Sequence, residues 1–334
     1  MARQPSIADV AADAGVSATT VSHALSGKRW VSESTRAKIE ESVERLGYRP
    51  NLVARGLRLQ RTQTVALLVV DISNPYYPAL ARAVTDALGD HGYITFIGNT
   101  DGNEAAERKF IQEAVARNVD GIIMQPMSLS FEEMRSLAGA TPLVIIGNTD
   151  IEPVADMVST LDELGIREGV AHLVANHHTN LAFVSGPADR EPGPARLHAF
   201  SAAARSAGLD VTGSNILHAP FTRDGGFAAG LTLLRREVSA RPTAIMCAND
   251  LIAIGVMDVA HDLRLSMPDQ VAVIGFDNIE TAGLVSPGLT TVDSLAVPVG
   301  SQSAKALLER IDEGDTTPFR ITELATRLVV RQSA

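Results

Sequence analysis

The sequence is poor in cysteine, in long apolar stretches and in positive charge. Cys247 is the single cysteine among 334 residues, so no intramolecular disulfide can form, and a reducing compartment is expected. No apolar stretch approaches the roughly 18 residues that a membrane helix needs. The first residues, Met1 to Pro5, lack the apolar segment typical of a secretory signal. These absences predict a cytoplasmic protein without a membrane anchor.

Motifs of common enzyme classes are also missing. The sequence contains no Gly-x-x-x-x-Gly-Lys-Ser/Thr phosphate loop, no Gly-x-Ser-x-Gly nucleophile turn and no His-Glu-x-x-His zinc pair. His172, His177 and His178 have no cysteine or clustered acid at ligand spacing, and we interpret them as surface or packing histidines. The sequence therefore predicts no catalytic residue, no metal site and no cofactor.

The net charge of −10 argues against a polyanion-binding protein until the charges are divided along the chain. Residues 1–61 hold ten Lys and Arg against six Asp and Glu, a net of +4. The remaining residues hold 19 basic and 33 acidic side chains, a net of −14. This asymmetry is typical of a small polyanion-binding module joined to an acidic body, although a charged helical surface without function gives the same count.

The basic segment carries start and stop signals for three helices. Ser6-Ile-Ala-Asp9 has the form of a capping box, and Ser17 can cap a second helix. A third helix is expected from Ser32 or Ser34 to Leu46. Glycines that can end the first and third helices follow them, at Gly15 and Gly47. Two short helices joined by a tight glycine turn form a helix-turn-helix, whose second helix enters the major groove of DNA.

In that geometry, the start of the second helix meets base edges with hydroxyls, an imidazole and methyl groups. The candidate DNA-binding residues there are Ser17, Ala18, Thr19, Thr20, Ser22 and His23. Residues 51–59 follow the third helix as a short basic segment, which alone reads as a linker. Its apolar residue between arginines suits insertion into a minor-groove step. The candidates in this segment are Asn51, Ala54, Leu57 and Arg58.

The whole segment closely resembles the lactose/galactose-repressor family. The residues that carry the resemblance are Ile7-Ala-Asp-Val-Ala-Ala-Asp-Ala-Gly-Val-Ser-Ala-Thr-Thr-Val-Ser22, Val31-Ser-Glu-Ser-Thr-Arg36, Leu46-Gly-Tyr-Arg-Pro-Asn51 and Ala54-Arg-Gly-Leu57. By this resemblance, Ala18, Thr19 and His23 read bases, and Leu57 wedges into the minor groove. His23 stands where the family usually has arginine, so the operator sequence of familiar members does not transfer.

The body after residue 61 alternates short apolar strands with helical segments. The strands are expected at 65–70, 93–97, 121–124, 143–146, 181–184, 244–246 and 271–274. Such alternation predicts an α/β fold with parallel sheets covered on both faces. Two sheets in tandem are favoured over a (β/α)₈ barrel because the apolar pattern restarts near residue 158. In open parallel sheets, ligands bind beyond the carboxyl ends of strands.

Residues of ligand-binding character follow several of these strands. Carboxylates, amides and an arginine can hydrogen-bond to hydroxyls, and aromatic faces can stack on a ring. Each residue alone could equally be a helix cap or a turn. The candidate effector site comprises Asp71, Asn74, Tyr76, Tyr77, Asn99, Arg196, Phe221, Asn249, Asp250 and Asp277.

The body resembles the same family, whose core is similar to periplasmic sugar-binding proteins. The resemblance implies a helix-turn-helix headpiece at 1–50, a hinge at 51–61, and a core at 62–334 for effector binding and dimerisation. The expected subdomains are about 62–160 plus 293–320, and about 161–290 plus 321–334. Two departures stand at positions where sugar-binding relatives often carry hydroxyl-binding pairs, namely Gly147-Asn148 and Leu161-Asp162. A plain hexose is therefore less expected than another polyol, a nucleoside or a modified sugar.

Together these observations predict a homodimeric repressor that binds pseudo-palindromic operator DNA under the control of a small, sugar-like effector. Two alternatives stay open: a repressor controlled by a protein corepressor with its cleft dormant, or a sugar-processing enzyme fused to a helix-turn-helix. The effector's identity, the sign of its action, the operator sequence, the regulated genes and any state above the dimer are left open.

Overall fold

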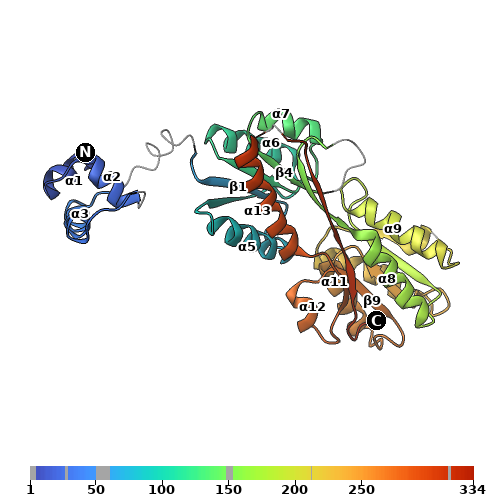
Figure 1. Ribbon diagram of the computed structural model, residues 1–334. Helices are drawn as coiled ribbons and strands as arrows, with labels where there is room; N and C mark the ends of the chain where they lie inside the picture. The colour runs from blue at the N-terminus through green and yellow to red at the C-terminus, as the bar shows by residue number, and fades with distance from the viewer. Residues whose placement is uncertain (1–4, 27–28, 50–60, 148–152, 212, 315–316) are drawn as a thin grey trace. The chain divides into compact units, whose positions relative to one another are not determined.

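The computed structural model describes residues 5–26, 29–49, 61–147, 153–211, 213–314 and 317–334 (Figure 1). The chain divides into two compact units, Met1–Thr62 and Gln63–Ala334. We call them the headpiece and the core. Asn51, Ala54, Leu57 and Arg58, which the sequence assigns to DNA binding, lie outside the described residues.

The headpiece consists of three short helices, α1 (Ile7–Ala14), α2 (Ala18–Ser26) and α3 (Glu33–Leu46). The capping box predicted at Ser6 is confirmed, and both predicted stop glycines are left-handed C-caps. Ser32 caps α3 through the backbone N–H of Thr35. Val10, Val21 and Ile39, one from each helix, are fully buried against one another and form the centre of a small apolar core.

The first sheet of the core has the strand order β11-β5-β4-β3-β1-β2, and all of its paired strands are parallel. Its strands are β1 (Thr64–Val69), β2 (Ile94–Asn99), β3 (Gly121–Met124), β4 (Leu143–Ile146), β5 (Asp156–Leu161) and β11 (Ile321–Ala325). Its helices are α5 (Tyr76–Gly89), α6 (Glu104–Ala116), α7 (Phe131–Ala138) and α13 (Ala296–Glu313).

Both faces of this sheet are covered, which explains the continuous apolar runs in the sequence. Val65 and Leu67 of β1 pack into a cluster with residues of α5 and α13, which lie side by side (Figure 1). The alternate residues of the same strand, Ala66 and Leu68, pack into another cluster with residues of α6 and α7. Alternate residues of one strand therefore enter different cores, because successive side chains point to opposite faces.

The second sheet has the order β12-β10-β9-β8-β6-β7 and is parallel except for the antiparallel pair of β10 and β12. Its strands are β6 (Leu181–Ser185), β7 (Ile216–His218), β8 (Ala244–Cys247), β9 (Ala272–Asp277), β10 (Thr290–Asp293) and β12 (Arg327–Val329). Its helical segments are α8 (Asp162–Ala175), α9 (Gly193–Ser206), the 3₁₀ turn Gly213–Asn215, α10 (Arg223–Leu234), α11 (Asp250–Asp262) and α12 (Glu280–Leu284).

The chain passes between the sheets three times: from β5 to α8, from β10 to α13, and from β11 to β12. The predicted pair of tandem sheets is confirmed, and the alternative (β/α)₈ barrel is wrong. One predicted subdomain boundary is also wrong. Residues 321–334 were expected in the second subdomain, but Ile321–Ala325 forms β11 and pairs with β5 of the first sheet. The crossover therefore falls after β11, because the last residues contribute a strand to each sheet.

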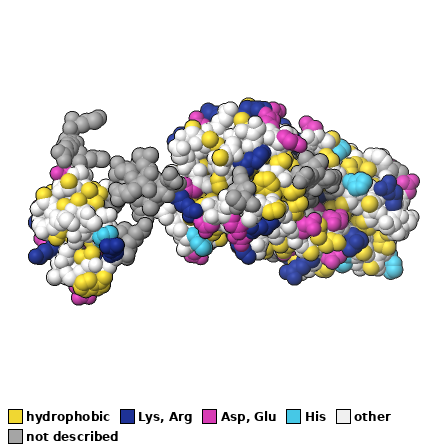
Figure 2. Space-filling model, turned by 45° about the horizontal axis from the view of Figure 1, so that its top comes forward, with side chains coloured by type: hydrophobic (Ala, Val, Ile, Leu, Met, Phe, Trp, Pro, Cys, Tyr) yellow, Lys and Arg dark blue, Asp and Glu magenta, His cyan; other side chains and the backbone are white. Residues whose placement is uncertain are grey.

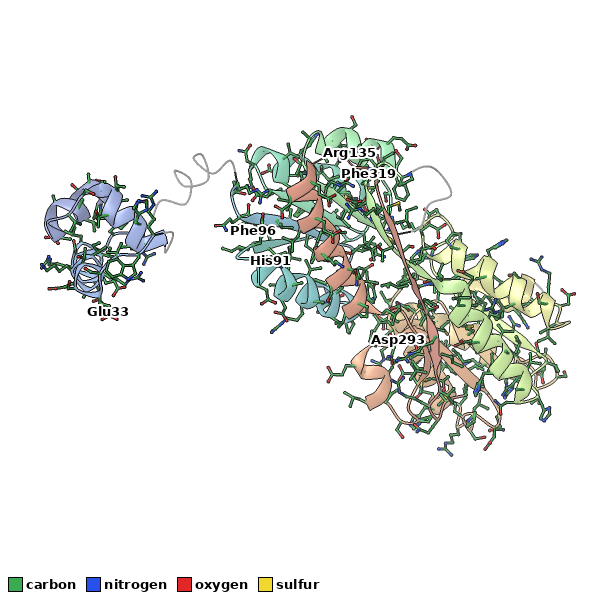
Figure 3. All side chains as sticks on the ribbon, viewed as in Figure 1. Glu33, His91, Phe96, Arg135, Asp293 and Phe319 are labelled. Carbon is green, nitrogen blue, oxygen red and sulfur yellow. The ribbon has the colours of Figure 1, made fainter. Side chains whose placement is uncertain are left out.

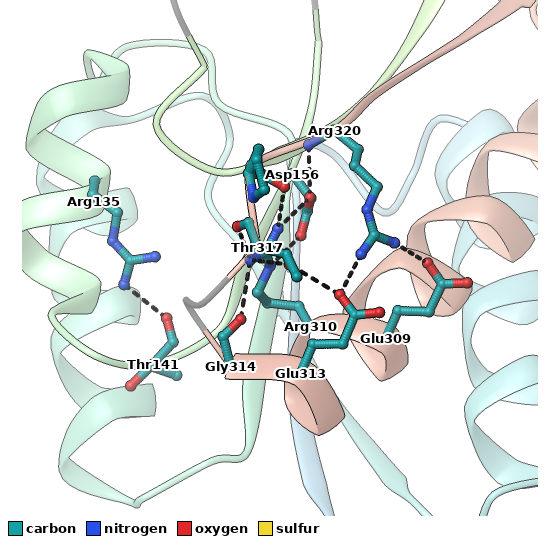
Figure 4. Close-up of polar contacts among 10 residues, drawn as sticks. Arg135, Thr141, Asp156, Glu309, Arg310, Glu313, Gly314, Thr317 and Arg320 are labelled. Carbon is teal, nitrogen blue, oxygen red and sulfur yellow. Dashed lines mark hydrogen bonds and ion pairs between the residues drawn. The ribbon is translucent and has the colours of Figure 1, made fainter.

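A buried arginine fastens the end of α13 to the first sheet (Figure 4). Arg310 donates from Nε and Nη2 to the two carboxylate oxygens of Asp156 at 2.7 and 2.9 Å. Its remaining donors bind the carbonyls of Gly314, Thr317 and Pro318, and Asp156 also accepts from the backbone N–H of Arg320. One guanidinium group thus joins the end of α13 to Asp156, Thr317 and Pro318.

Charges of both signs are interspersed over the visible face of the core (Figure 2). Within the part of the chain that the structure describes, no helix combines the length and apolarity needed to cross a bilayer.

Candidate nucleic-acid interface and effector cleft

The start of α2 presents the residues that the sequence assigns to base contact. Ser17 Oγ accepts a hydrogen bond from the backbone N–H of Thr20 at 3.1 Å and lies 2.8 Å from the Thr20 hydroxyl. Ala18 and Thr19 are exposed, whereas Ser22 and His23 are half-buried along the same helix. Because Val21 is fully buried in the headpiece core, α2 keeps one face inward and leaves its first turn accessible. This arrangement suits a recognition helix.

Exposed basic side chains also occur on the rest of the headpiece. Arg29, Arg36, Lys38 and Arg49 are exposed, and Arg45 forms an ion pair with Asp13 that joins α3 to α1. Exposed cations of this kind supply phosphate contacts. The headpiece therefore offers base-reading and phosphate-binding groups on one small unit.

The core contains a cavity of about 980 Å³ lined by residues of both sheets. Its walls come from the carboxyl ends of β1, β3, β4 and β5 on one side, and from α8, α9 and the ends of β8 and β9 on the other. Eight of the ten candidate effector residues line it: Asp71, Asn74, Tyr76, Tyr77, Arg196, Phe221, Asn249 and Asp277. The rule that ligands sit beyond the carboxyl ends of parallel strands thus leads to this cavity.

Arg196 is anchored from three directions. Its Nε donates to Asp162 Oδ2 at 2.8 Å, and its Nη1 donates to the carbonyl of Ala248 at 2.6 Å. The guanidinium lies over the ring of Phe276, 3.6 Å from the centroid. Burial opposes its charge, but the nearby carboxylates of Asp162 and Asp277 outweigh burial and raise the pKa of Arg196. The group is therefore a fixed, charged donor in the cavity wall.

Asp277 stands at the end of β9, 3.7 Å from Arg196 Nη1. Burial raises the pKa of its carboxyl to about 7, and Asp162 adds to this rise, whereas Arg196, Ser294 and Asn74 lower it. Its backbone has a φ of 114°, a region that favours glycine. Asn74 belongs to the loop after β1, so its interaction with Asp277 links the two sides of the cleft.

The loop after β1 is ordered by its own polar side chains. Asp71 Oδ1 accepts from the backbone N–H and hydroxyl of Ser73, and Asn74 Oδ1 accepts from the N–H of Tyr76. The rings of Tyr76 and Tyr77 meet edge to face, with centroids 5.2 Å apart. Burial raises the pKa of the Tyr77 hydroxyl well above its usual value, so the phenol remains protonated.

Two candidate residues do not line the cavity. Asn99 accepts from the N–H of Ile72 and donates to Asp101, so it supports the loop after β1. Asp250 is fully buried, where it accepts from the Thr291 hydroxyl and the N–H of Ile279. Asn249 does line the cavity, although its amide also caps α11 and binds the carbonyl of Phe221.

Several residues that line the cavity were not predicted from the sequence. Asp162 is the most consequential, because the Leu161-Asp162 pair was interpreted as a loss of hydroxyl-binding groups, whereas its carboxylate lies in the cavity and holds Arg196. Gln125 and Met127 follow β3, Phe131 begins α7 after the same loop, and Thr160 is the penultimate residue of β5. All of them obey the same strand-end rule, which could have found them.

Among the described residues, no three His, Cys, Asp or Glu side chains are arranged to hold a metal ion. The cavity instead combines fixed hydrogen-bond donors and acceptors with aromatic surfaces, which is the composition of a binding site for a small polar organic molecule.

The helix-turn-helix headpiece and the two-sheet core define a class: a DNA-binding unit joined to a core of the periplasmic-binding-protein type. Residues 6–51 match the family described as bacterial regulatory proteins, lacI family, and residues 170–334 match the periplasmic binding protein-like domain. Catabolite control protein A of Priestia megaterium is 35% identical over 330 residues, with 98% of each chain covered. The ribose operon repressor of Escherichia coli (strain K12) is 32% identical over 332 residues, again with 98% of each covered.

A solved structure of the lac repressor dimer bound to operator and an anti-inducer has the same fold. It is 24% identical to this chain, superposes with a TM-score of 0.87, and covers 99% of both chains. The chain therefore belongs to the lacI family of bacterial transcription regulators, the family whose motifs its first sixty residues carry.

Proposed function

We propose that this protein is a repressor whose affinity for operator DNA is controlled by a small polar molecule bound in the cavity of the core. The supporting observation is that one chain joins an accessible recognition helix to a cavity of about 980 Å³ that both sheets line. A ligand that prefers one relative position of the two sheets shifts the population of conformations. Its relatives regulate transcription, so the protein acts in the cytoplasm, where operator DNA is found.

A regulatory role is favoured over an enzymatic one by the state of the ionisable groups. Arg196 forms ion pairs with both Asp162 and Asp277, so this cluster is suited to hold a polar ligand. Cys247 is buried, and burial raises the pKa of its thiol, which makes it a poor nucleophile.

DNA binding is tested by selecting duplexes from a random pool on the full chain. We expect the recovered sequences to share a pseudo-palindrome, because two symmetry-related headpieces read two half-sites. Trp30, the single tryptophan, is 88% exposed on the headpiece and gives a fluorescence signal for binding. Thr19→Ala should weaken binding to the selected duplex more than to one with an altered half-site. Recovered pools without a shared sequence contradict the proposal.

The proposed homodimer is supported by the edge of the first sheet. β2 is an edge strand in the described core, and three of its apolar side chains are about half exposed: Ile94 at 57%, Phe96 at 55% and Ile97 at 48%. Phe96 is labelled in Figure 3. An exposed apolar edge is typical of a surface that another copy covers. The lac repressor structure named above is itself a dimer.

Phe96→Glu should therefore shift the protein from dimer to monomer, since it places a charge in the covered apolar edge. Sedimentation equilibrium measures this change. Val238→Glu is the matched control, because Val238 is 79% exposed elsewhere on the core. If both variants remain dimeric, the β2 edge is not the interface.

A further inference from the structure

The two walls of the cavity differ in chemistry. The wall from the first sheet presents mainly apolar side chains, among them Met127, Leu129, Phe131, Ile146 and Val158. Asp71 is the one ionisable lining residue that the described part of this wall contributes besides its two tyrosines. The wall from the second sheet carries the other charged lining groups: Asp162, Glu163, Arg167, Glu191, Arg196 and Asp277. A ligand that spans the cavity therefore meets an apolar surface on one side and a polar surface on the other.

The polar wall does not suit an anion. Five carboxylates and two guanidinium groups line the described cavity, so its net charge is negative. Arg196 already has Asp162 at 2.8 Å and Asp277 at 3.7 Å, and its charge is therefore neutralised before a ligand arrives. A phosphate group would add about −1.5 to −2 charges close to these carboxylates. Hydroxyl groups, in contrast, can donate to the carboxylates and accept from the guanidinium.

The apolar wall also contains polar side chains, and one of them has a buried acceptor without a partner among the described residues. Gln125 follows β3, and its Oε1 is buried without a hydrogen-bond partner among the described residues. An unsatisfied buried acceptor is costly unless a ligand supplies a donor. Phe131 and Met127, which are partly exposed, lie on the same wall. The wall is therefore suited to a flat apolar group that carries an N–H or O–H donor.

We infer that the effector is an uncharged, unphosphorylated molecule with a polyhydroxylated ring and an attached apolar, planar group, as in a nucleoside or an aryl glycoside. This inference rests on the proposed function and specifies its ligand. The hydroxylated ring binds between Arg196, Asp162 and Asp277, and the planar group packs against Phe131 and Met127. A volume of about 980 Å³ is at the upper end of the range for small-molecule sites and leaves room for both parts.

The test compares matched ligands by isothermal titration calorimetry on the full chain. The amphiphilic probes are adenosine and para-nitrophenyl glucoside, the parent sugars are ribose and glucose, and the anionic probes are adenosine monophosphate and the phosphorylated glucoside. The affinity for at least one amphiphilic probe should be at least about tenfold higher than the affinity for its parent sugar and for its phosphorylated form. Which of the two binds distinguishes a nucleoside from a glycoside.

Two variants test the assignment of each part of the ligand to a wall. Phe131→Ala should reduce the affinity for the amphiphilic probe about tenfold, with no change for the parent sugar. Asp162→Asn releases the Arg196 guanidinium, so the affinity for the phosphorylated probe should rise relative to the affinity for the neutral probe. Asp262→Asn, the same change of charge at an exposed position that does not line the cavity, is the control and should alter the ratio of the two affinities little.

Two outcomes overturn the inference: a phosphorylated probe or a parent sugar that binds as tightly as the amphiphilic one, or a whole panel that does not bind. Neither outcome affects the DNA-binding part of the proposed function, which fails separately if no operator is selected.

Discussion

At the scale of single residues, Asp277 combines burial, a backbone conformation that disfavours side chains, and a pKa of about 7. These properties occur together where it meets Arg196 and Asn74, at the junction of the two sides of the cavity. Strained, buried carboxyls are frequent at functional sites because surrounding contacts must hold them in place. Asp277 is therefore a central group of the proposed effector site.

The raised pKa of Asp277 predicts a dependence of stability on pH. Between the usual carboxyl pKa of 3.8 and about 7, the folded state binds this proton more tightly than the unfolded state. The contribution of Asp277 to the free energy of unfolding therefore falls as pH rises through this window. In Asp277→Asn the decline should be shallower, as measured by urea unfolding at several pH values from about 5 to 7. Asp90→Asn, at an exposed position, is the control. Equal slopes in Asp277→Asn and the unchanged protein contradict the prediction.

The sequence located most of the candidate site but could not orient its side chains. Strand-end positions were predictable because parallel strands present their carboxyl ends at one edge. Asn249 and Asp250 are neighbours at such an end, yet one lines the cavity and the other turns inward to Thr291. Burial and hydrogen-bond partners from distant segments decide between these directions, and a local pattern contains neither.

At the scale of elements, α10 and α11 approach each other closely because both carry glycine at the contact. A Cβ on Gly226 would lie 2.0 Å from the carbonyl oxygen of Ile252, and one on Gly255 would lie 2.0 Å from that of Arg223. Gly255→Ala should therefore lower the free energy of unfolding by about 1–3 kcal/mol or more through overpacking. Gly89→Ala, at a helix end with no atom within 4 Å of the new Cβ, should be neutral or slightly stabilising. Urea unfolding of both variants provides the comparison, and equal stabilities argue against tight packing here.

The Arg310–Asp156 pair predicts a second effect at this scale. Arg310→Met leaves the buried Asp156 carboxylate without its partner, so we expect a loss of about 3–5 kcal/mol in the free energy of unfolding. Arg82→Met removes an exposed helical pair with Asp86 and should cost only about 0.5 kcal/mol. If thermal unfolding shows similar losses for the two variants, the buried pair does not hold the end of α13.

Elements in the interior were easier to predict from the sequence than those at the edges. The seven expected strands all correspond to observed ones. Six of them are interior strands, which are buried on both faces and therefore form short apolar runs, whereas β2 is a half-exposed edge strand. The strands that went unpredicted are the interior strands β5 and β10 and the edge strands β7, β11 and β12, and the three edge strands carry exposed or half-exposed residues. Their position depends on pairing with distant strands, such as β11 with β5.

At the scale of the whole molecule, the division of charge along the sequence corresponds to the division into units. The basic segment of residues 1–61 coincides with the headpiece, and the acidic remainder forms the core. Electrostatic attraction to DNA then acts on one small unit, which favours a fast and salt-dependent association. The cavity lies within the core, so the proposed control by a ligand acts on that unit.

The central claim is that occupancy of this cavity changes operator affinity. Fluorescence anisotropy of a selected, labelled operator with the full chain measures this, without ligand and at a concentration of the best-binding probe that calorimetry shows to be saturating. We predict a change of about 5–150-fold in the dissociation constant, a typical coupling between two sites. The change should vanish in an Arg196→Ala variant that still binds the operator. An unchanged operator affinity at full occupancy of the cavity contradicts the account.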